Sequence, residues 1–373
     1  MPPHPLHSFE VTQTWGTQVK NAILADTPVT LASIPSTCQA DLSSVARVFS
    51  RTYSNRAVVP WLWEDVEEML TSFRIPEGDW NAFLERYFED SLLCPKSLLQ
   101  VFNTPTLFCD TLGNIVLWYI PGAFGADHQT QATRAAYPDT QRFPNSILDI
   151  NQEDGVLQKA GSTDVLHGEE GRLMLSHLRN TNRILASWLS LVHPTLFAQQ
   201  MKLHQALYSE DCKHMLRNPG FIYPSYTNWT SPFPGFMLSG NQLLSFRKDE
   251  ANIHTFHALL AFGTHSGGRV KIPSLRAAFD FEPGCAIFFP AAAMRYSVEA
   301  APSGQRVVMR TYCDTKLGWK AMGHKYALGL RRPTLDFIEK QLTPRRLIPF
   351  VEQNELHMSN SHSIDNPDYV RYY

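Results

Sequence analysis

Short apolar runs alternate with turn signals over residues 233–312, and this pattern constrains the fold more than any other feature of the sequence. Glycine or proline interrupts the pattern at 263–268, 273, 283–284 and 302–304. Turn signals at intervals of about 8–12 residues are typical of a β-sandwich or jelly roll. We therefore expect strands at Phe233–Leu238, Phe256–Phe262, Arg269–Ile272, Ala278–Phe281, Ala286–Phe289 and Val307–Tyr312.

Helical periodicity surrounds this region. Apolar side chains recur at three- and four-residue spacing from Ser43 to Arg86, and residues 169–208 look helical apart from a break at His193. The break is expected because the residue before a proline disfavours helical geometry. Residues 106–120 carry a hairpin signature with glycine and asparagine in the turn,. The sequence thus predicts an α+β protein in which helices precede and flank a jelly-roll core.

The same patterns divide the chain into five segments. Residues 125–168 are rich in polar residues and glycine, which favours a long loop inserted into the β-rich domain,. The predicted segments are a loose lead-in (1–40), a helical region (41–100), the main β-domain with its polar insertion (101–315), a basic helical region (316–350) and a frayed tail (351–373).

Composition narrows the class of protein. A net charge of −2 argues against a protein whose whole surface binds nucleic acid,. The six cysteines include no CxxC pair, which makes a disulfide scaffold or structural zinc module a poor expectation,. The N-terminus has no leader pattern, and no apolar run reaches the roughly 20 residues of a membrane span,. We expect an intracellular protein, cytoplasmic or nuclear, that does not contact membranes.

Within residues 229–314, the order of four short segments along the chain is informative. They are Gly267-Gly-Arg-Val-Lys-Ile-Pro273, Phe279-Asp-Phe-Glu-Pro-Gly284, Met294-Arg-Tyr-Ser-Val298 and Gly304-Gln-Arg-Val-Val308. Together they resemble the double-stranded β-helix of iron(II)- and 2-oxoglutarate-dependent dioxygenases. Within that superfamily, the sequence is similar to the fungal branch of the ten-eleven-translocation/J-binding-protein-like enzymes. Residues 100–230 share the resemblance loosely. It implies a jelly-roll core, with 2-oxoglutarate and Fe(II) as the cofactors to look for.

The resemblance also implies where the iron ligands should be, and neither of the family's histidines is present there. The family holds iron with two histidines and a carboxylate. Phe246 and Lys248 stand where the first histidine and the carboxylate belong, and a shift by one residue restores Asp249 beside Arg247 but supplies no histidine. Tyr296 stands at the second histidine.

The co-substrate arginine is the element of the family site that this sequence keeps. Arg306, ten residues beyond Tyr296, matches the arginine that binds the far carboxylate of 2-oxoglutarate, and Arg310 on the same strand face is a second candidate,. The other interpretation of Arg306 is an exposed strand residue after a turn. Both stay open at this point.

Other residues could in principle rebuild a metal site. His254 and His257 lie three apart at a strand start, so at most one of them points inward, where it could join Asp249 and Tyr296,. The favoured interpretation is one surface histidine and one hydrogen-bonded core histidine. His265 lies in a glycine-rich turn and is expected to face solvent.

The basic region offers a possible partner surface. Between residues 316 and 346, eight basic side chains stand against Asp336 and Glu339. Such a stretch could contact phosphates of a nucleic acid, or could be a solvated helix that covers the edge of the β-domain. The basic residues are Lys316, Lys320, Lys325, Arg331, Arg332, Lys340, Arg345 and Arg346.

Three hypotheses follow. The first is a dioxygenase-like protein that has lost its iron site and acts as a non-catalytic binding module for nucleic acid or a protein partner. The second is an active oxygenase with rearranged ligands, whose substrate by family analogy would be a flipped nucleobase. The third is an unrelated jelly roll with a lectin-like or structural role.

Overall fold

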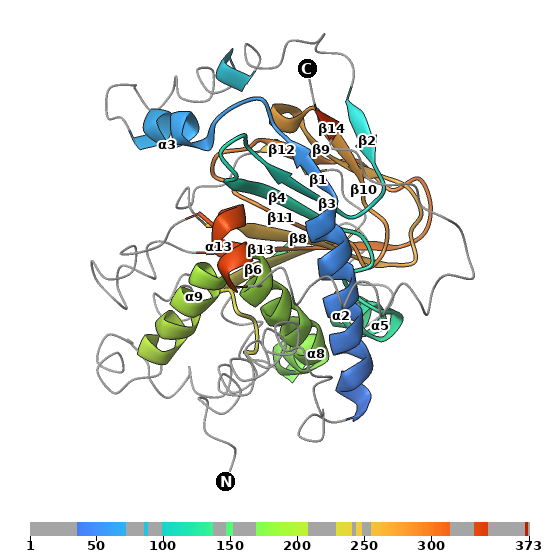
Figure 1. Cartoon of the computed structure of the whole chain (residues 1–373). Coiled ribbons are helices and arrows are strands. Elements are labelled where there is room, and N and C mark those ends of the chain that lie inside the picture. Colours follow the sequence, from blue (N-terminus) through green and yellow to red (C-terminus); the bar gives the residue numbers. More distant parts are fainter. Residues whose placement is uncertain are drawn as a thin grey trace, which may run out of the picture.

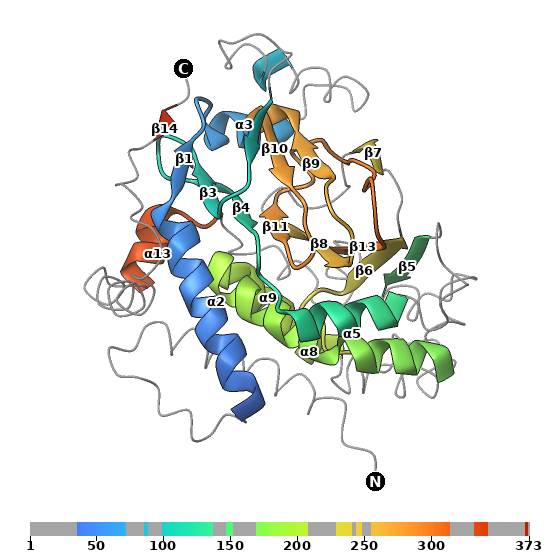
Figure 2. The same ribbon diagram turned by 90° about the vertical axis from the view of Figure 1, so that its right-hand side faces the viewer.

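The computed structural model describes residues 36–71, 86–88, 99–136, 147–151, 169–207, 229–240, 244–247, 255–313, 332–341 and 370–371. Within these ranges the chain forms two β-sheets, here called sheet A and sheet B, together with a group of helices (Figure 1). Most of the helices gather on one side of the strands, as Figure 2 shows. The predicted α+β class is confirmed.

Sheet A has nine strands in the order β14-β1-β3-β4-β11-β8-β13-β6-β5. β3 and β4 form the hairpin that the sequence predicted at 106–120. β13 lies between β8 and β6 and pairs with each of them over six residues. The bounds are β1 (Arg56–Val58), β3 (Thr106–Cys109), β4 (Ile115–Ile120), β5 (Ile147–Asn151), β6 (Gly235–Gly240), β8 (His257–Gly263), β11 (Ala286–Phe289), β13 (Arg306–Tyr312) and β14 (Val370–Arg371).

Sheet B has five strands in the order β2-β10-β9-β12-β7. From β6 onward the chain crosses repeatedly between the sheets, because β6, β8, β11 and β13 belong to sheet A while β7, β9, β10 and β12 belong to sheet B. A short 3-10 helix, η2, joins β9 to β10. The bounds are β2 (Gln100–Phe102), β7 (Leu244–Arg247), β9 (Arg269–Ile272), η2 (Pro273–Leu275), β10 (Ala277–Asp280) and β12 (Tyr296–Val298).

Helices cover the face of sheet A that points away from sheet B (Figure 2). Trp118 of β4 is fully buried there and stacks on Phe49 of α2, with ring centroids 5.3 Å apart. No helix in the described part of the chain is long and apolar enough to cross a membrane. The helices are α2 (Ser36–Ser54), α3 (Trp63–Thr71), α5 (Ala126–Ala136), α8 (Glu169–Val192), α9 (Pro194–Leu207) and α13 (Leu335–Gln341).

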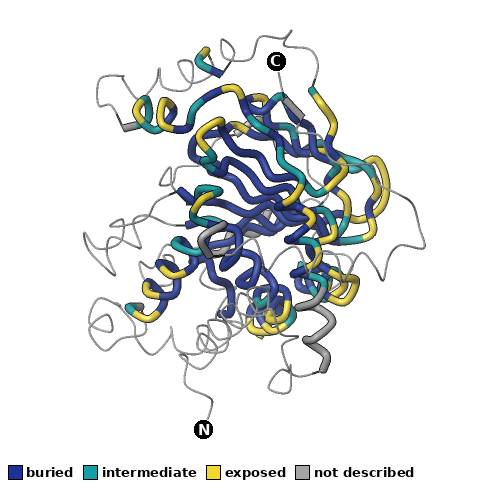
Figure 3. Tube along the Cα trace, viewed as in Figure 1, coloured by how far each residue is buried: buried dark blue, intermediate teal, exposed yellow. Residues whose placement is uncertain are grey.

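Alternate residues of sheet A point into two separate apolar cores. In β8, Leu260 and Phe262 belong to the core shared with the helices, whereas Leu259 and Ala261 belong to the core shared with sheet B. This is the two-residue periodicity of a strand that is buried on both faces. The tube in Figure 3 is accordingly buried along most of the central strands.

The predicted helix break at His193 is confirmed. α8 ends at Val192 and α9 begins at Pro194. The Nδ1 atom of His193 accepts a hydrogen bond from the backbone N–H of Leu196 (3.3 Å). The imidazole therefore satisfies one of the backbone donors that the first turn of α9 leaves without a helical partner.

The polar stretch 125–168 is not a loop throughout, which corrects the sequence-based expectation for part of it. It contains α5 and the edge strand β5, whereas residues 137–146 and 152–168 lie outside the described ranges. His128, Ala132 and Ala135 of α5 are buried at three- and four-residue spacing, and α5 packs against α8. The buried side chains of α5 are small, so the sequence shows only a weak apolar pattern there. The helix is stabilised mainly by its packing against α8.

Asp110 ties the β3–β4 hairpin to the start of α3. One carboxylate oxygen accepts hydrogen bonds from the backbone N–H groups of Leu112 (2.9 Å) and Asn114 (2.8 Å). The other accepts from the Asn114 side-chain amide (2.8 Å) and from the backbone N–H of Trp63 (2.9 Å). The carboxylate, which is 2% exposed, thus holds together two segments that are far apart in sequence.

We expect Asp110→Ala to lower the free energy of unfolding by about 2–4 kcal/mol, because it leaves the buried backbone N–H of Trp63 and three half-buried N–H donors of the turn without their acceptor,. Urea denaturation followed by circular dichroism measures the change. The control is Leu112→Ala in the same turn, since Leu112 is 60% exposed and its truncation should be nearly neutral,. Equal effects of the two substitutions would contradict the role of Asp110.

His204 of α9 makes stability depend on pH. It is fully buried, its Nε2 atom lies 3.3 Å from the carbonyl oxygen of Pro232, and burial lowers its pKa to about 3. The unfolded chain binds a proton near pH 6.5 and the folded chain does not, so stability is lost as the pH falls below about 6.5.

We expect His204 to contribute about 2 kcal/mol of the stability lost between pH 7 and pH 5. The measurement is the free energy of unfolding at both pH values for the natural chain and for His204→Gln, which should lose less stability on acidification. His177→Gln, at a half-buried position of α8, is the matched control. The same loss in all three proteins would show that His204 does not cause it.

Candidate functional site

β13 carries two arginines on the face that packs against sheet B. Val307 and Met309 belong to the core on the helix side, whereas Val308 belongs to the core shared with sheet B. Side chains alternate along a strand, so Arg306 and Arg310 share the inward face of β13 with Val308. Arg306 is 0% exposed and Arg310 is 7% exposed. The interpretation of Arg306 as an exposed strand residue is therefore wrong.

The Arg306 side chain reaches the chain segment that leads into sheet B. A Cβ atom built on Gly268 would lie 2.8 Å from the Nη1 atom of Arg306, so the guanidinium occupies space that a larger residue would fill. Removal from water lowers the pKa of Arg306 from its ordinary value. The glycine pair 267–268 was singled out in the sequence as a family segment, and in the structure it forms a cradle for this guanidinium.

Two facing loops form the wall beside Arg306. The backbone N–H of Thr264 donates to the carbonyl of Gln305 (2.8 Å), and the hydroxyl groups of Ser266 and Ser303 are hydrogen-bonded to each other (2.7 Å). Gly304 has φ +78°, and a Cβ there would approach His265 backbone atoms to within 2.6–2.8 Å. Glycine allows these two loops to approach closely.

His265 is buried in this wall, contrary to the sequence-based expectation that it faces solvent. It is 3% exposed, and its Nε2 atom lies 2.8 Å from the carbonyl oxygen of Phe281. Burial lowers its pKa below the ordinary histidine value, and the nearby charge of Arg306 lowers it further, while the hydrogen bond opposes the shift. His265 is thus neutral at pH 7 and donates from Nε2. Sequence reasoning missed it because only the contact between loops buries it.

Arg310 lies farther along the inward face of β13. Its guanidinium carbon is 5.4 Å from the ring centroid of Tyr312, within the range of a cation–π contact,. Its backbone neighbours across the sheet are Leu259 of β8 and Met237 of β6. One strand therefore places two cationic side chains in the same core.

Tyr296 and His257 are both neighbours of Phe289. His257 is the cross-strand partner of Phe289, and the Phe289 ring packs edge-on against Tyr296 with centroids 5.1 Å apart. Tyr296 and His257 are both buried, at 0% and 1% exposed. His257 thus points inward, which agrees with both interpretations of the histidine pair. His254, the other histidine of the pair, lies outside the described residues.

The described residues do not fit the family's iron site. Phe246 lies in β7, while Lys248 and Asp249 fall outside the described ranges. The donors that the structure brings near Phe289 are a phenol and an imidazole, which differ from two imidazoles and a carboxylate. In the described part of the chain, no group of three or more His, Cys, Asp or Glu side chains is arranged to hold a metal ion.

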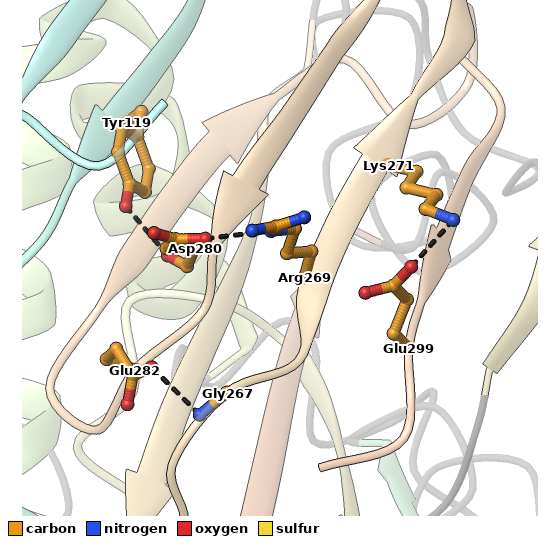
Figure 4. A network of polar contacts seen from close by, with 7 residues as sticks. All are labelled: Tyr119, Gly267, Arg269, Lys271, Asp280, Glu282 and Glu299. Carbon is orange, nitrogen blue, oxygen red and sulfur yellow. Dashed lines mark hydrogen bonds and ion pairs between the residues drawn. The ribbon is translucent and has the colours of Figure 1, made fainter. Parts of the chain in front are cut away.

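Polar contacts on the outer face of sheet B connect the loop that carries Gly268 to the neighbouring strand (Figure 4). Arg269 pairs with Asp280 (2.9 Å), and the backbone N–H of Gly267 donates to Glu282 (2.9 Å). The hydroxyl group of Tyr119 donates to the Asp280 carbonyl (2.7 Å), which joins β4 of sheet A to β10. Exposed ion pairs stabilise little individually, so their main effect is to hold the strand ends in place.

One cation of the basic region is buried instead of exposed. Arg332 is 8% exposed, its guanidinium carbon lies 3.1 Å from the centroid of a Trp63 ring, and it donates to the carbonyl of Ile115 (3.3 Å). Burial lowers its pKa well below the ordinary arginine value. Arg332 therefore packs in the core and is not placed to contact a nucleic acid. The basic residues at 316–331 and 342–346 lie outside the described ranges.

Comparisons with known proteins find similarity to solved structures only. No family model and no curated protein matches the sequence. One similar solved structure is NgTET1 in complex with 5mC DNA, at 15% identity and a TM-score of 0.41, covering 68% of this chain and 92% of that chain.

Two further solved structures are similar. An oxidoreductase of the 2OG-Fe(II) oxygenase family from Burkholderia pseudomallei is 18% identical, with a TM-score of 0.18 over 21% of this chain and 40% of that chain. The viral collagen prolyl hydroxylase of Paramecium Bursaria Chlorella virus-1, in its 2OG complex, is 11% identical, with a TM-score of 0.28 over 52% and 93%. All three scores are low, so the proposals below rest on this chain's own residues.

We expect Gly268→Ala to destabilise the protein more than Gly122→Ala. Both glycines have positive φ (+85° and +72°), so alanine costs about 1–2 kcal/mol of backbone strain at either position,. Only Gly268 faces the guanidinium of Arg306, since nothing lies within 4 Å of a Cβ at Gly122. The extra loss for Gly268→Ala should be about 1 kcal/mol or more in urea denaturation. Equal losses would show that the surroundings of Arg306 accommodate a methyl group at position 268 without strain.

Proposed function

We propose that this chain is a protein of the 2-oxoglutarate dioxygenase type that binds a small dicarboxylate without iron, as a non-catalytic binding module. The strand order supports the fold part of the proposal. The eight strands from β6 to β13 divide four and four between the sheets, and the chain changes sheet at every step except from β9 to β10. An eight-stranded jelly roll of the double-stranded β-helix kind also divides its strands between two sheets.

The observation that carries the proposal is the burial of Arg306 on the inward face of β13. A guanidinium binds a carboxylate through two parallel hydrogen bonds, and the attraction is screened less in a site that excludes water. Because Gly268 has no side chain, the Arg306 guanidinium fits beside it. Two loops in contact with each other lie next to Arg306. This environment suits the far carboxylate of 2-oxoglutarate, as the family resemblance implies for this position.

The replacement of both family histidines supports the loss of iron. Phe246 offers no donor atom, and Tyr296 is a buried phenol packed against Phe289. A phenol is not among the two imidazoles and one carboxylate that hold ferrous iron in this type of site. We therefore assign the interior a binding role and no redox step.

The second candidate is an active oxygenase with non-standard ligands, in which Asp249 and a histidine hold iron. The observation in its favour is that His257, as cross-strand partner, and Tyr296, through ring packing, both neighbour Phe289. A nucleobase substrate and contact with nucleic acid through the basic region would belong to this candidate, and both stay predictions from the sequence.

An anaerobic titration separates the two candidates. Metal-stripped protein is titrated with 2-oxoglutarate in a calorimeter and then with Fe(II) while the visible spectrum is recorded. We expect stoichiometric binding of 2-oxoglutarate without metal, and no charge-transfer band when Fe(II) is added. A stoichiometric band would overturn the iron-free proposal in favour of the oxygenase.

The matched variants are Arg306→Gln and Arg172→Gln, the latter at an exposed position of α8. Loss of one charge-assisted bidentate pair should weaken 2-oxoglutarate binding about 30-fold or more in Arg306→Gln. Arg172→Gln should bind like the natural chain, and circular dichroism checks that both variants are folded. No binding of 2-oxoglutarate with or without Fe(II) would remove the proposed function altogether.

A further inference from the structure

His265 lies three residues before Gly268, in the loop beside the Arg306 guanidinium. Its side chain is buried at 3% exposed, and a Cβ atom at Gly268 would lie 2.8 Å from the Nη1 atom of Arg306. The same loop pairs with the segment before β13, because the backbone N–H of Thr264 donates to the carbonyl of Gln305 (2.8 Å). Two facing loops therefore hold the imidazole near enough to the guanidinium for the charge of Arg306 to act on it.

The two ring nitrogens of His265 have different surroundings. Nε2 lies 2.8 Å from the carbonyl oxygen of Phe281, which can only accept a hydrogen bond, so Nε2 carries the hydrogen atom of the neutral ring,. Nδ1 then bears a lone pair, and it has no hydrogen-bond partner among the described residues. A buried acceptor without a donor costs free energy. Nδ1 is therefore the atom of this loop that is ready to gain a proton when an anion binds nearby.

The groups around His265 act on that proton in both directions. Burial disfavours it most, and the positive charge of Arg306 disfavours it further, so both lower the pKa of the ring. The carboxylate of Glu282, which accepts a hydrogen bond from the backbone of the same loop (Figure 4), favours the protonated ring. The backbone groups of Phe281 and Gln305 favour it as well. A further negative charge at Arg306 would add to the favourable side.

We infer that His265 takes up a proton when a carboxylate group of the ligand binds at Arg306, so that the site binds a dicarboxylate more tightly at mildly acidic pH. This inference rests on the proposed function and adds the regulation of the same site. A carboxylate neutralises the guanidinium, which removes the repulsion between the two cations. The protonated ring donates from both nitrogens, whereas the lone pair of the neutral ring would repel a carboxylate oxygen.

Proton uptake fixes how the affinity depends on pH. In the empty site, burial holds the pKa of His265 below its ordinary value, and a bound carboxylate raises this pKa,. Between the two values the complex carries a proton that the empty protein lacks, so the affinity rises as the pH falls from 8 to 6. Uptake of one full proton corresponds to a tenfold rise per pH unit, to about that limit. Simple carboxyl groups titrate near pH 4 and stay ionised over this range.

The test is calorimetric titration of the full chain with 2-oxoglutarate in the presence of EDTA at pH 6, 7 and 8. Each titration is run in two buffers that differ in ionisation enthalpy, because the difference in heat counts the protons taken up. We expect an uptake of about half a proton or more at pH 6, and an affinity about threefold or more higher at pH 6 than at pH 7.

Two variants assign the proton to His265. His265→Gln keeps an N–H donor for the carbonyl of Phe281 but cannot titrate, so it should abolish the uptake and flatten the pH dependence,. Glu282→Gln, at an exposed position, removes the favourable carboxylate and should reduce the uptake at pH 6. His177→Gln, at a half-buried position of α8, is the matched control and should behave like the natural chain. Circular dichroism checks that each variant is folded.

The outcomes separate this inference from the proposed function. If 2-oxoglutarate binds and requires Arg306, but the natural chain takes up no proton between pH 6 and 8, the proton linkage is wrong and the binding module stands. The same conclusion follows if uptake persists in His265→Gln, or, should that variant not fold, if Glu282→Gln leaves the uptake unchanged. If 2-oxoglutarate binds at no pH, the proposed function and the inference both fall.

Discussion

Sheet A is buried on both faces, and this constraint governs the rest of the structure. The helices remove one face from water and sheet B removes the other, so every central strand must supply side chains to two cores. The sheet satisfies its backbone groups through its own ladder, which leaves the side chains to decide what each core contains. The core on the helix side contains aromatic and aliphatic side chains, as the stacking of Trp118 on Phe49 illustrates.

The other core combines apolar side chains with charge. Placing Arg306 there costs free energy unless its guanidinium is hydrogen-bonded or neutralised. The surroundings are organised accordingly, with glycine where the guanidinium needs space and a neutral His265 in place of a second cation. The exposed pairs of Figure 4 lie outside this core and hold its boundary in position.

The sequence predicted the β-rich half closely because its signals are local. Turn residues and two-residue periodicity place β8 and β13 within one residue of their observed bounds, and the family segments led to Arg306. β12, with three residues, is too short to show a period, although Tyr296 at its start was singled out. His265, α5 and the buried position of Arg332 were missed because their environment depends on segments distant in sequence. The ligand role of Asp249 and His254 stays a prediction, since both lie outside the described residues.

The alternation along β13 limits how this protein can change over evolution. Exchanging one residue for another affects one core, but inserting or deleting a single residue within the strand would reverse the orientation of every position beyond it. An arginine now between the sheets would then face Trp118, Phe236 and the aliphatic side chains under the helices. Length variation should therefore be tolerated in the connecting loops and excluded from β13, whatever ligand the interior holds.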